Sequence, residues 1–294
     1  MDSFRVVLDA NVFSLDHFDV LDRSPIRDLV SRGRLELIYG DVMLNEVIAS
    51  YGVTRTRDAF LTRWVPFILG TATKFGADLQ TIWQREVIQG RGPHASIWLP
   101  AKAFERIKAE LSSLPSDGTW PGLDETKGER DDEAKKKANQ RALSVDIRQV
   151  ASRALRARNI TADKVTHEAF RSLTDQHMET IGRAVGEAHF HTFDARAVAN
   201  RWARAKGRYP YFTQFAANMT YKELYAMFKP NAPIDTNAQA DLDILTHLLR
   251  ADAVVTNEIG FMRTAFNDLW RSRGKTLFTS EEFAEFLRPT QRNT

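Results

Sequence analysis

The sequence predicts an α/β protein whose parallel sheet is split in the sequence by a large all-helical insertion. Strand and helix patterns alternate over residues 1–55, the same alternation returns over residues 230–294, and the chain between them reads as helical. Strands that alternate with helices favour parallel pairing through right-handed crossovers. We therefore expect a core formed by 1–55 and 230–294, with the insertion over 56–229.

The first part of the core begins with a short apolar strand. Phe4–Leu8 reads FRVVL, a β-branched run typical of a strand buried in a parallel sheet. Ser24 and Pro25 then provide the start of a helix that Gly33 ends. A second strand is expected over Leu35–Tyr39, and a further helix follows it.

The second part of the core repeats this pattern. Thr236 and Gln239 form a capping-box signature ahead of a leucine-rich helix. Strands are expected over Ala253–Thr256 and Lys275–Thr279, with a helix between them. Ser280 is expected to cap the final helix, because serine is a favoured residue at that position.

The composition excludes several functional classes. With 294 residues and 43% hydrophobic residues, the chain can bury a core and is not expected to be disordered. It has no cysteine, which excludes disulfides, Cys-ligated zinc, iron–sulfur clusters and thiol nucleophiles. The N-terminus lacks a secretory-signal pattern, and no apolar run approaches the roughly 20 residues of a membrane helix. We expect a cytoplasmic protein without a membrane span.

Positive charge is concentrated in the predicted insertion. The chain has 41 Lys and Arg against 38 Asp and Glu, a net charge of +3, but Arg148–Arg208 alone has 12 against 6. Within RWARAKGRYPYF, the cations Arg204, Lys206 and Arg208 are interleaved with aromatic residues. Such a segment can contact RNA through phosphates and stacked bases. A basic helix end followed by a packing loop explains the pattern equally well.

Two acids directly follow strands of the predicted sheet. Asp9 comes after the first strand, and Glu258 comes after the strand AVVT. Open α/β sheets bind ligands outside the carboxyl ends of their strands, so acids at two such ends would lie at the same edge. The alternative is that both are solvated loop residues.

Two further acids lie on predicted helices. At 100° per residue, Asp241 points with the leucine-rich face of its helix, whereas Asp243 points away with Thr246 and His247. A carboxylate on an apolar face is costly unless it is paired or binds a metal, so Asp241 is the candidate. A buried salt bridge or a hydrogen-bonded cap is the structural alternative. Glu46 lies at the border of its helix's apolar face.

Four segments resemble successive motifs of the PIN-domain nucleases. They are VVLDANVF at 6–13, NEV at 45–47, ADLDIL at 240–245 and VVTNEIGF at 254–261. The closing KTLFTSEEFAEFL also resembles the last strand and helix of that family. The two core parts together have about 120 residues, close to one PIN domain. The resemblance says nothing about the insertion.

The resemblance implies a metal-dependent phosphodiesterase, usually an endoribonuclease. Carried over by position, the catalytic and metal-binding acids are Asp9, Glu46, Asp241 and Glu258. The polar residues expected to contact the substrate are Asn11, Thr256 and Asn257, besides the basic segment with Arg204, Lys206 and Arg208. The family more often has Asp where this chain has Glu258, and the longer side chain would weaken metal binding or shift the ligand role to Asn257.

Convergent carboxylates repel one another and require a cation to remain ionised together. Mg²⁺ or Mn²⁺ would suit such an all-oxygen site and would activate a water molecule that attacks phosphorus. The expected partner is nucleic acid, with RNA favoured over DNA. A homo-oligomer or a protein inhibitor would be consistent with the same interpretation.

Other interpretations of the sequence stay open. A PIN-like chain that no longer cleaves would act as an RNA-binding or partner-docking module, and a toxin would be neutralised by an antitoxin. A haloacid-dehalogenase-type phosphatase needs a second acid where Asn11 stands, and no Walker motif occurs. EAHFHTFD, with Glu187, His189, His191 and Asp194, would bind zinc only with a further ligand.

Overall fold

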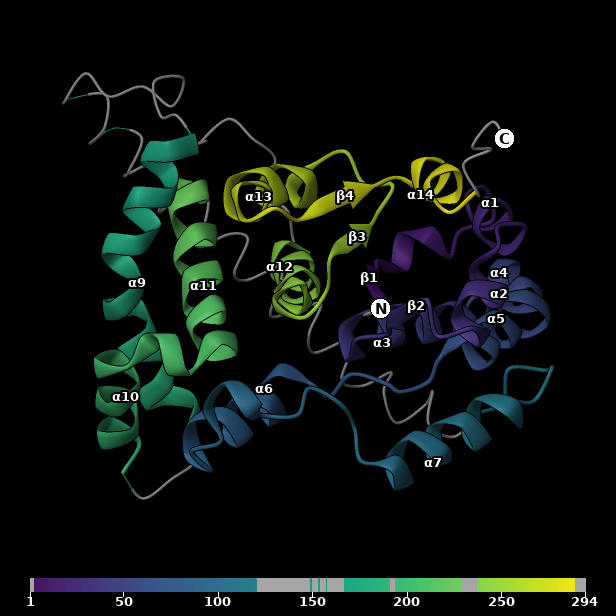
Figure 1. Ribbon diagram of the computed structural model, residues 1–294, viewed down its shortest axis with the longest axis horizontal. Helices are drawn as coiled ribbons and strands as arrows, with labels where there is room; N and C mark the ends of the chain where they lie inside the picture. The colour runs from purple at the N-terminus through teal and green to yellow at the C-terminus, as the bar shows by residue number, and fades with distance from the viewer. Residues whose placement is uncertain are drawn as a thin grey trace, which may run out of the picture.

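The computed structural model describes residues 3–120, 167–190, 194–228 and 237–288, and the isolated positions 149, 153 and 157 (Figure 1). The strands are β1 (Phe4–Leu8), β2 (Leu35–Ile38), β3 (Ala253–Val255) and β4 (Thr276–Phe278). The α-helices up to residue 112 are α1 (Phe18–Asp22), α2 (Ile26–Ser31), α3 (Asp41–Ala49), α4 (Thr54–Ala59), α5 (Val65–Thr71), α6 (Leu79–Trp83) and α7 (Ala101–Ser112). The later helices are α9 (His167–His189), α10 (Ala195–Arg204), α11 (Pro210–Phe228), α12 (Ala238–Thr246), α13 (Phe261–Leu269) and α14 (Ser280–Phe286).

The strands form one sheet that is parallel throughout, as the alternating pattern predicts, and their order is β2-β1-β3-β4. Val6 of β1 lies opposite Leu37 of β2 on one side and opposite Ala253 of β3 on the other. The chain therefore leaves β1 in one direction to form β2, and β3 and β4 are added on the opposite side. The carboxyl ends of β1 and β3 flank the point at which the strand order reverses.

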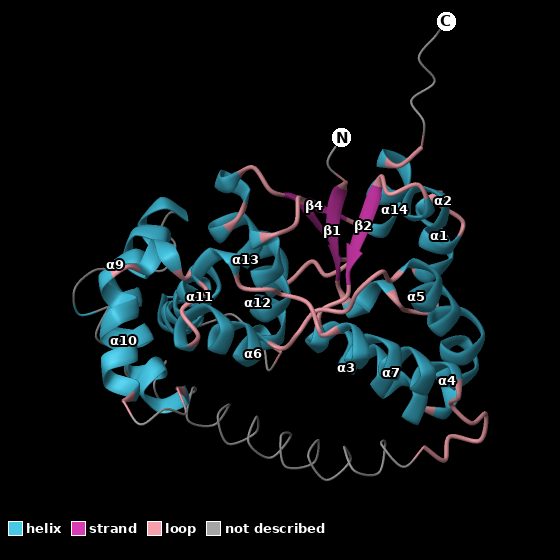
Figure 2. Ribbon diagram, turned by 60° about the horizontal axis from the view of Figure 1, so that its bottom comes forward, coloured by secondary structure: helices cyan, strands magenta, loops and turns pink. Residues whose placement is uncertain are grey.

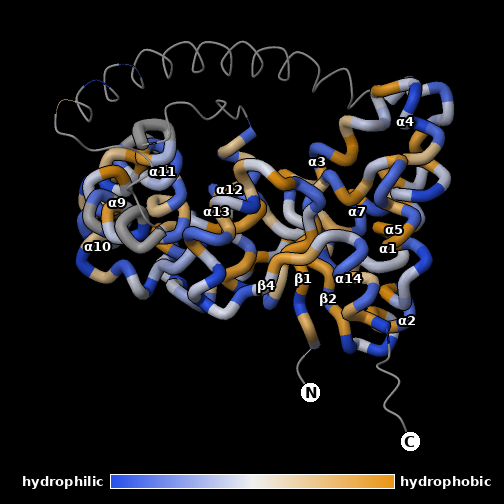
Figure 3. Tube along the Cα trace, turned by 90° about the horizontal axis from the view of Figure 1, so that it is seen from above, coloured by the Kyte–Doolittle hydropathy of each residue, from blue (hydrophilic) through white to orange (hydrophobic). Residues whose placement is uncertain are grey.

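Helices cover both faces of the sheet, and successive residues of each strand face opposite cores. In Figure 2, α12 and α13 lie on one side of β1 and β2, and α1, α5 and α14 lie on the other. The first core includes Val7, Ile38, Val254, Leu242 and Met262. The second core includes Val6, Leu8, Val255, Phe67 and Phe283. Figure 3 shows the resulting concentration of hydrophobic residues along the strands.

The predicted boundaries of the insertion, after 55 and before 230, do not coincide with a break in packing. Trp64 and Phe67 lie in the core that contains Val6, and Tyr221 lies in the core that contains Val7. The short helices before residue 55 are too small to cover one face of the sheet, so later helices complete it. A third core, around Trp83, Trp202 and Phe212, is built from α6, α10 and α11.

The final helix differs from its prediction at the first residue. Thr279, not Ser280, is the cap: its Oγ1 accepts from the backbone N–H of Glu282 at 3.2 Å, and the Glu282 carboxylate accepts from the backbone N–H of Thr279 at 2.8 Å. Ser280 is the first helical residue and is fully buried. The predicted cap at Thr236 lies outside the described residues. None of the helices described has the length and apolar character needed to cross a bilayer.

Candidate active site

The carboxyl ends of β1 and β3 bring two buried polar residues together. Asp9 follows β1 and Thr256 follows β3, and the backbone N–H of Asp9 donates to the carbonyl of Val255 at 3.0 Å. The Asp9 residue is 5% exposed and Thr256 is 1% exposed. Because the strand order reverses between β1 and β3, this is the place where an open α/β sheet binds its ligand.

The carboxyl group of Asp9 is held in an environment that disfavours its charge. The Thr256 hydroxyl donates to Asp9 Oδ2 at 2.6 Å. Burial raises the pKa of Asp9, and the hydrogen bonds from Thr256 and from the backbone N–H groups of Ala10 and Asn11 only partly oppose this. A cation next to Asp9 would lower that pKa and stabilise the carboxylate.

Thr256 connects the polar residues that follow the two strands. Its Oγ1 accepts from Asn11 Nδ2 at 3.0 Å and lies 3.1 Å from the backbone N of Glu258, which also donates to it. The side chain of Asn11 in turn accepts from the backbone N–H of Asn257 at 3.0 Å. Asp9, Asn11, Thr256 and the backbone of residues 257–258 therefore form one network.

Ser280, which the sequence predicts only as a helix cap, extends this network to the last helix. Asn257 Nδ2 donates to Ser280 Oγ at 2.8 Å, and the backbone N–H of Ser280 donates to Asn257 Oδ1 at 2.9 Å. With both side-chain groups of Asn257 bound to Ser280, Asn257 anchors the loop after β3. Ser280 lies just after β4 in the sequence, and this position was the signal that could have identified it as a residue of the site.

The carboxylate of Glu258 lies at the start of α13. The backbone N–H of Met262 faces both of its oxygens, at 3.3 and 3.4 Å. Gly260 permits this arrangement, because a Cβ at that position would lie 2.7 Å from Glu258 Oε1. The Glu258 side chain thus reaches the first turn of the following helix.

The other two predicted acids lie on helices at the side of the sheet. Glu46 is exposed on α3, and Asp241 is half-buried in the first turn of α12, which packs against α3. Within the described ranges, no three His, Asp or Glu side chains are grouped closely enough to hold a metal ion. Thr256 links Asp9 to the backbone N–H of Glu258 and not to its carboxylate. The four predicted acids, all of them described, do not form one metal-binding group.

The prediction that Asp243 faces away from the protein is wrong. Gln239 Nε2 donates to Asp243 Oδ1 at 2.8 Å, and burial together with the negative charge of Asp41 raises the pKa of Asp243 to about 7. Thr246 and His247, predicted on the same outward face, are 0% and 3% exposed.

The helical periodicity misplaced this face because α12 has neighbours on several sides. It lies between β3 and α11 in Figure 1 and also packs against α3 and α13, so apolar and polar faces alike are covered. The imidazole of His247 fits against Gly40, where a Cβ would lie 2.7 Å from Nε2. Asp41, the first residue of α3, was not predicted as a site residue, and burial raises its pKa as well. We call the carboxyl edge of the sheet, with Asp9, Asp41, Asp243 and Glu258, the acidic edge.

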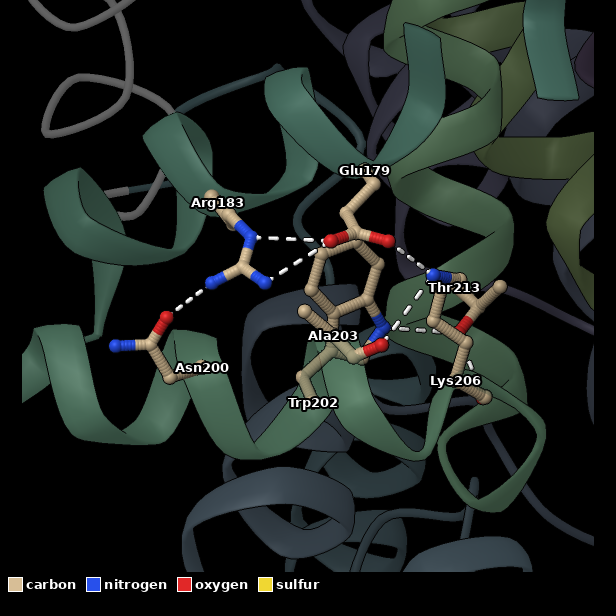
Figure 4. Close-up of polar contacts among 7 residues, drawn as sticks. All are labelled: Glu179, Arg183, Asn200, Trp202, Ala203, Lys206 and Thr213. Carbon is tan, nitrogen blue, oxygen red and sulfur yellow. Dashed lines mark hydrogen bonds and ion pairs between the residues drawn. The ribbon is translucent and has the colours of Figure 1, made fainter. Parts of the chain in front are cut away.

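One cation of the predicted basic segment is occupied by an ion pair. Figure 4 shows Glu179 of α9 between Arg183 and Lys206. The distance from Lys206 Nζ to Glu179 Oε2 is 2.5 Å. Arg183 binds the same carboxylate at 2.9 Å and also binds Asn200. Lys206 therefore joins η7 (Lys206–Arg208) to α9. The side chains of Arg204 and Arg208 are exposed.

The aromatic residues of the basic segment belong to the third core. Trp202, Tyr209, Tyr211 and Phe212 are at most 5% exposed, and Trp202 Nε1 donates to Thr213 Oγ1 at 2.9 Å. Rings buried in this way do not offer a face on which a base can stack. The alternation of cations and aromatic rings in this segment is explained by an amphipathic helix, α10, followed by a loop whose rings pack in the core.

The histidine-containing segment supports no metal site among the described residues. Asp194 accepts from the backbone N–H of Ala197 at 2.9 Å and so caps α10. Glu187 is exposed near the end of α9. His191 lies outside the described residues.

Replacing Thr256 by valine should test how far the network positions Asp9. The change keeps the shape of the side chain but removes the hydroxyl that binds Asp9, Asn11 and the backbone of Glu258. We expect a loss of about 1–2 kcal/mol in the free energy of unfolding. We also expect a 10- to 100-fold weaker response of any activity to metal, roughly the effect of losing an outer partner of a ligand. Thr256→Ser, which retains the hydroxyl, should stay close to wild type, and equal behaviour of both variants would exclude this role.

No protein-family model, curated protein or solved structure matches this chain. The likeness to the PIN nucleases is therefore carried by the short motifs around Asp9, Glu46, Asp241 and Glu258.

Proposed function

We propose that this chain is a cytoplasmic, metal-dependent nuclease with a PIN-like core, and that it hydrolyses phosphodiester bonds at the acidic edge. The observation that carries the proposal is the buried carboxyl group of Asp9 at the reversal point of the sheet, bound to Thr256 at 2.6 Å. A structural acid could occupy many positions, but this one is where ligands bind in open α/β sheets.

The donor chemistry at this edge suits a hard divalent cation. Burial raises the pKa of Asp9, Asp41 and Asp243, so the edge holds carboxyl groups whose charge is poorly compensated. Mg²⁺ commonly binds through one or two carboxylates, with waters and substrate phosphates completing its shell. A group of three acids, which is not found among the described residues, is therefore not required for such a site.

Asp9 would be the central ligand, and the motif resemblance names Glu258, Asp241 and Glu46 as the further acids of the site. Thr256 orients the Asp9 carboxylate, and the bonds between Asn257 and Ser280 hold the loop that contains Glu258. A bound Mg²⁺ or Mn²⁺ would supply an activated water and would stabilise negative charge on the phosphate. The motif resemblance favours RNA over DNA as the substrate.

Incubation with end-labelled single-stranded RNA and DNA tests this function. Cleavage should require Mg²⁺ or Mn²⁺, should stop in EDTA, and should be faster on RNA. Cleavage that persists in EDTA would contradict a metal-dependent site.

Two observations favour a second function. The described acids form no three-residue metal group, and the Glu258 carboxylate faces the backbone N–H of Met262. Both fit a PIN-like module that binds RNA without cutting it. In the same assay, RNA binding that is unchanged in EDTA, with no cleavage in Mn²⁺, would favour this module over the nuclease.

A further inference from the structure

An acidic edge repels the phosphates of a nucleic acid, so a basic side chain near it, besides the proposed metal, would favour substrate binding. Arg204, Lys206 and Arg208 precede α11, at its N-terminal end. Lys222, fourteen residues after Arg208, is on α11 itself. At 1.5 Å per helical residue, the twelve residues from Pro210 to Lys222 place Lys222 about 18 Å along the axis of α11. Figure 1 shows α11 beside α12, and Lys222 is a cation of α11 that reaches α12.

Lys222 is connected to Asp243 by a single amide. Its Nζ donates to Gln239 Oε1 at 3.0 Å, and Gln239 Nε2 donates to Asp243 Oδ1 at 2.8 Å. Among the described residues, no Asp or Glu forms an ion pair with Lys222. An ammonium group has three N–H donors, and the bond to Gln239 uses one of them.

The surroundings of Lys222 strengthen its interaction with an incoming anion. The side chain is half-buried, and burial lowers its pKa although Glu223 and Asp243 act in the opposite direction. Charges interact more strongly where water is partly excluded. By contrast, Lys206 already forms a direct ion pair with Glu179.

We propose that Lys222 is the phosphate-binding cation of the acidic edge, and that it contacts a backbone phosphate of the bound nucleic acid. Gln239 keeps the ammonium apart from Asp243, so that the charge of Lys222 stays available for the phosphate. This inference rests on the proposed function and names a substrate-binding residue for it.

The test compares Lys222→Met with Lys222→Arg and with Lys275→Met. Lys275 is a suitable control because its Nζ also has a single described partner, the carbonyl of Ala251 at 2.7 Å, but it lies at the amino end of β4. Binding of labelled single-stranded RNA is measured in EDTA over a range of salt concentrations. Initial rates with Mn²⁺ are measured on the same RNA, and thermal unfolding verifies that each variant is folded.

Lys222→Met should lower the log–log salt slope by about 0.7, the value for one lost phosphate contact on a single strand. Its KM should rise about tenfold with kcat nearly unchanged, because a ground-state contact is lost. Lys222→Arg and Lys275→Met should keep the wild-type slope. A wild-type slope in Lys222→Met, with cleavage intact, overturns the role of Lys222 and leaves the nuclease in place. If the slope of Lys222→Met is reduced but the wild type does not cleave, the phosphate contact of Lys222 is supported and the nuclease activity is overturned. If the wild type does not bind RNA, both proposals are overturned.

Discussion

Replacing Asp9 by asparagine should abolish metal-dependent cleavage without unfolding the protein. Asp9 would be a direct metal ligand, so the loss should exceed the roughly 100-fold effect of removing an outer partner. The pKa of Asp9 is raised by burial above its ordinary value of 3.8. As pH rises past that value, the unfolded chain ionises Asp9 before the folded protein does, and the folded state loses stability. Asparagine removes this loss, and its Oδ1 can still accept from Thr256.

The measurement is an initial rate with Mn²⁺, together with the unfolding temperature at pH 7. We expect the unfolding temperature of Asp9→Asn to equal or exceed that of the wild type. Asp16→Asn is the control, because Asp16 is an exposed acid in the loop that follows Asp9, and its rate should not change. Full activity in Asp9→Asn would remove Asp9 from the reaction. Lost activity with a much lower unfolding temperature would instead mean a structural acid.

Replacing Glu86 by alanine should destabilise the fold more than the loss of the Thr256 hydroxyl. Glu86 is fully buried, and its two oxygens accept from the backbone N–H groups of Tyr211 at 3.0 Å and Phe212 at 2.9 Å. These N–H groups belong to the first turn of α11, where the helix itself offers no acceptor. Each buried donor left unsatisfied costs about 1–3 kcal/mol. We therefore expect a loss of about 3–5 kcal/mol and a fall of about 10 °C in unfolding temperature.

Glu86 also predicts a dependence of stability on pH. Burial raises its pKa to about 7 from an ordinary value of 4.5, against the effect of the two N–H donors. Between pH 4.5 and 7 the unfolded state releases a proton that the folded state retains, so stability falls as pH rises, by about 3 kcal/mol in all. The side chain introduced by Glu86→Gln cannot ionise. From pH 5 to pH 8, the free energy of unfolding of the wild type should therefore fall relative to that of Glu86→Gln.

Urea unfolding at both pH values measures these effects. Glu110→Ala is the control for the alanine variant, because Glu110 is on the surface of α7 and forms an exposed pair with Arg106. It should cost no more than about 0.5 kcal/mol. An equal effect of the Glu86 and Glu110 substitutions would show that Glu86 does not hold the start of α11.

The sheet and the polar residues at its edge were predictable because both depend on local patterns. A buried strand reads as an apolar run, and parallel strands place their carboxyl ends together, so Asp9 and the residues after β3 could be expected at one edge. The motif resemblance added Asn11 and Thr256 as polar neighbours of Asp9. The structure joins them through hydrogen bonds of 2.6 and 3.0 Å. The parallel pairing of the strands is confirmed, whereas the metal and the reaction stay predictions.

The features that were missed depend on neighbours distant in the sequence. The outward face assigned to Asp243 assumed that one side of α12 meets solvent, and α3 and α11 cover that side instead. Glu86 and its partner Tyr211 are 125 residues apart. Lys222 of α11 donates to Gln239 on another helix, α12. No periodicity within one helix can show which other helix supplies its capping acid or its cation.

The strand order also determines when the acidic edge can form as the chain folds. Val6 pairs with Leu37 over 31 residues of chain, but with Ala253 over 247 residues. Loop-closure entropy makes the second pairing costlier by about 2 kcal/mol, at roughly 0.6 kcal/mol for each doubling of the loop. During synthesis, β1 and β2 can pair long before β3 exists, and one side of β1 stays open to other chains in that interval. Asp9 acquires Thr256 only when β3 closes that side, so the nascent protein completes its fold and its proposed site in the same step.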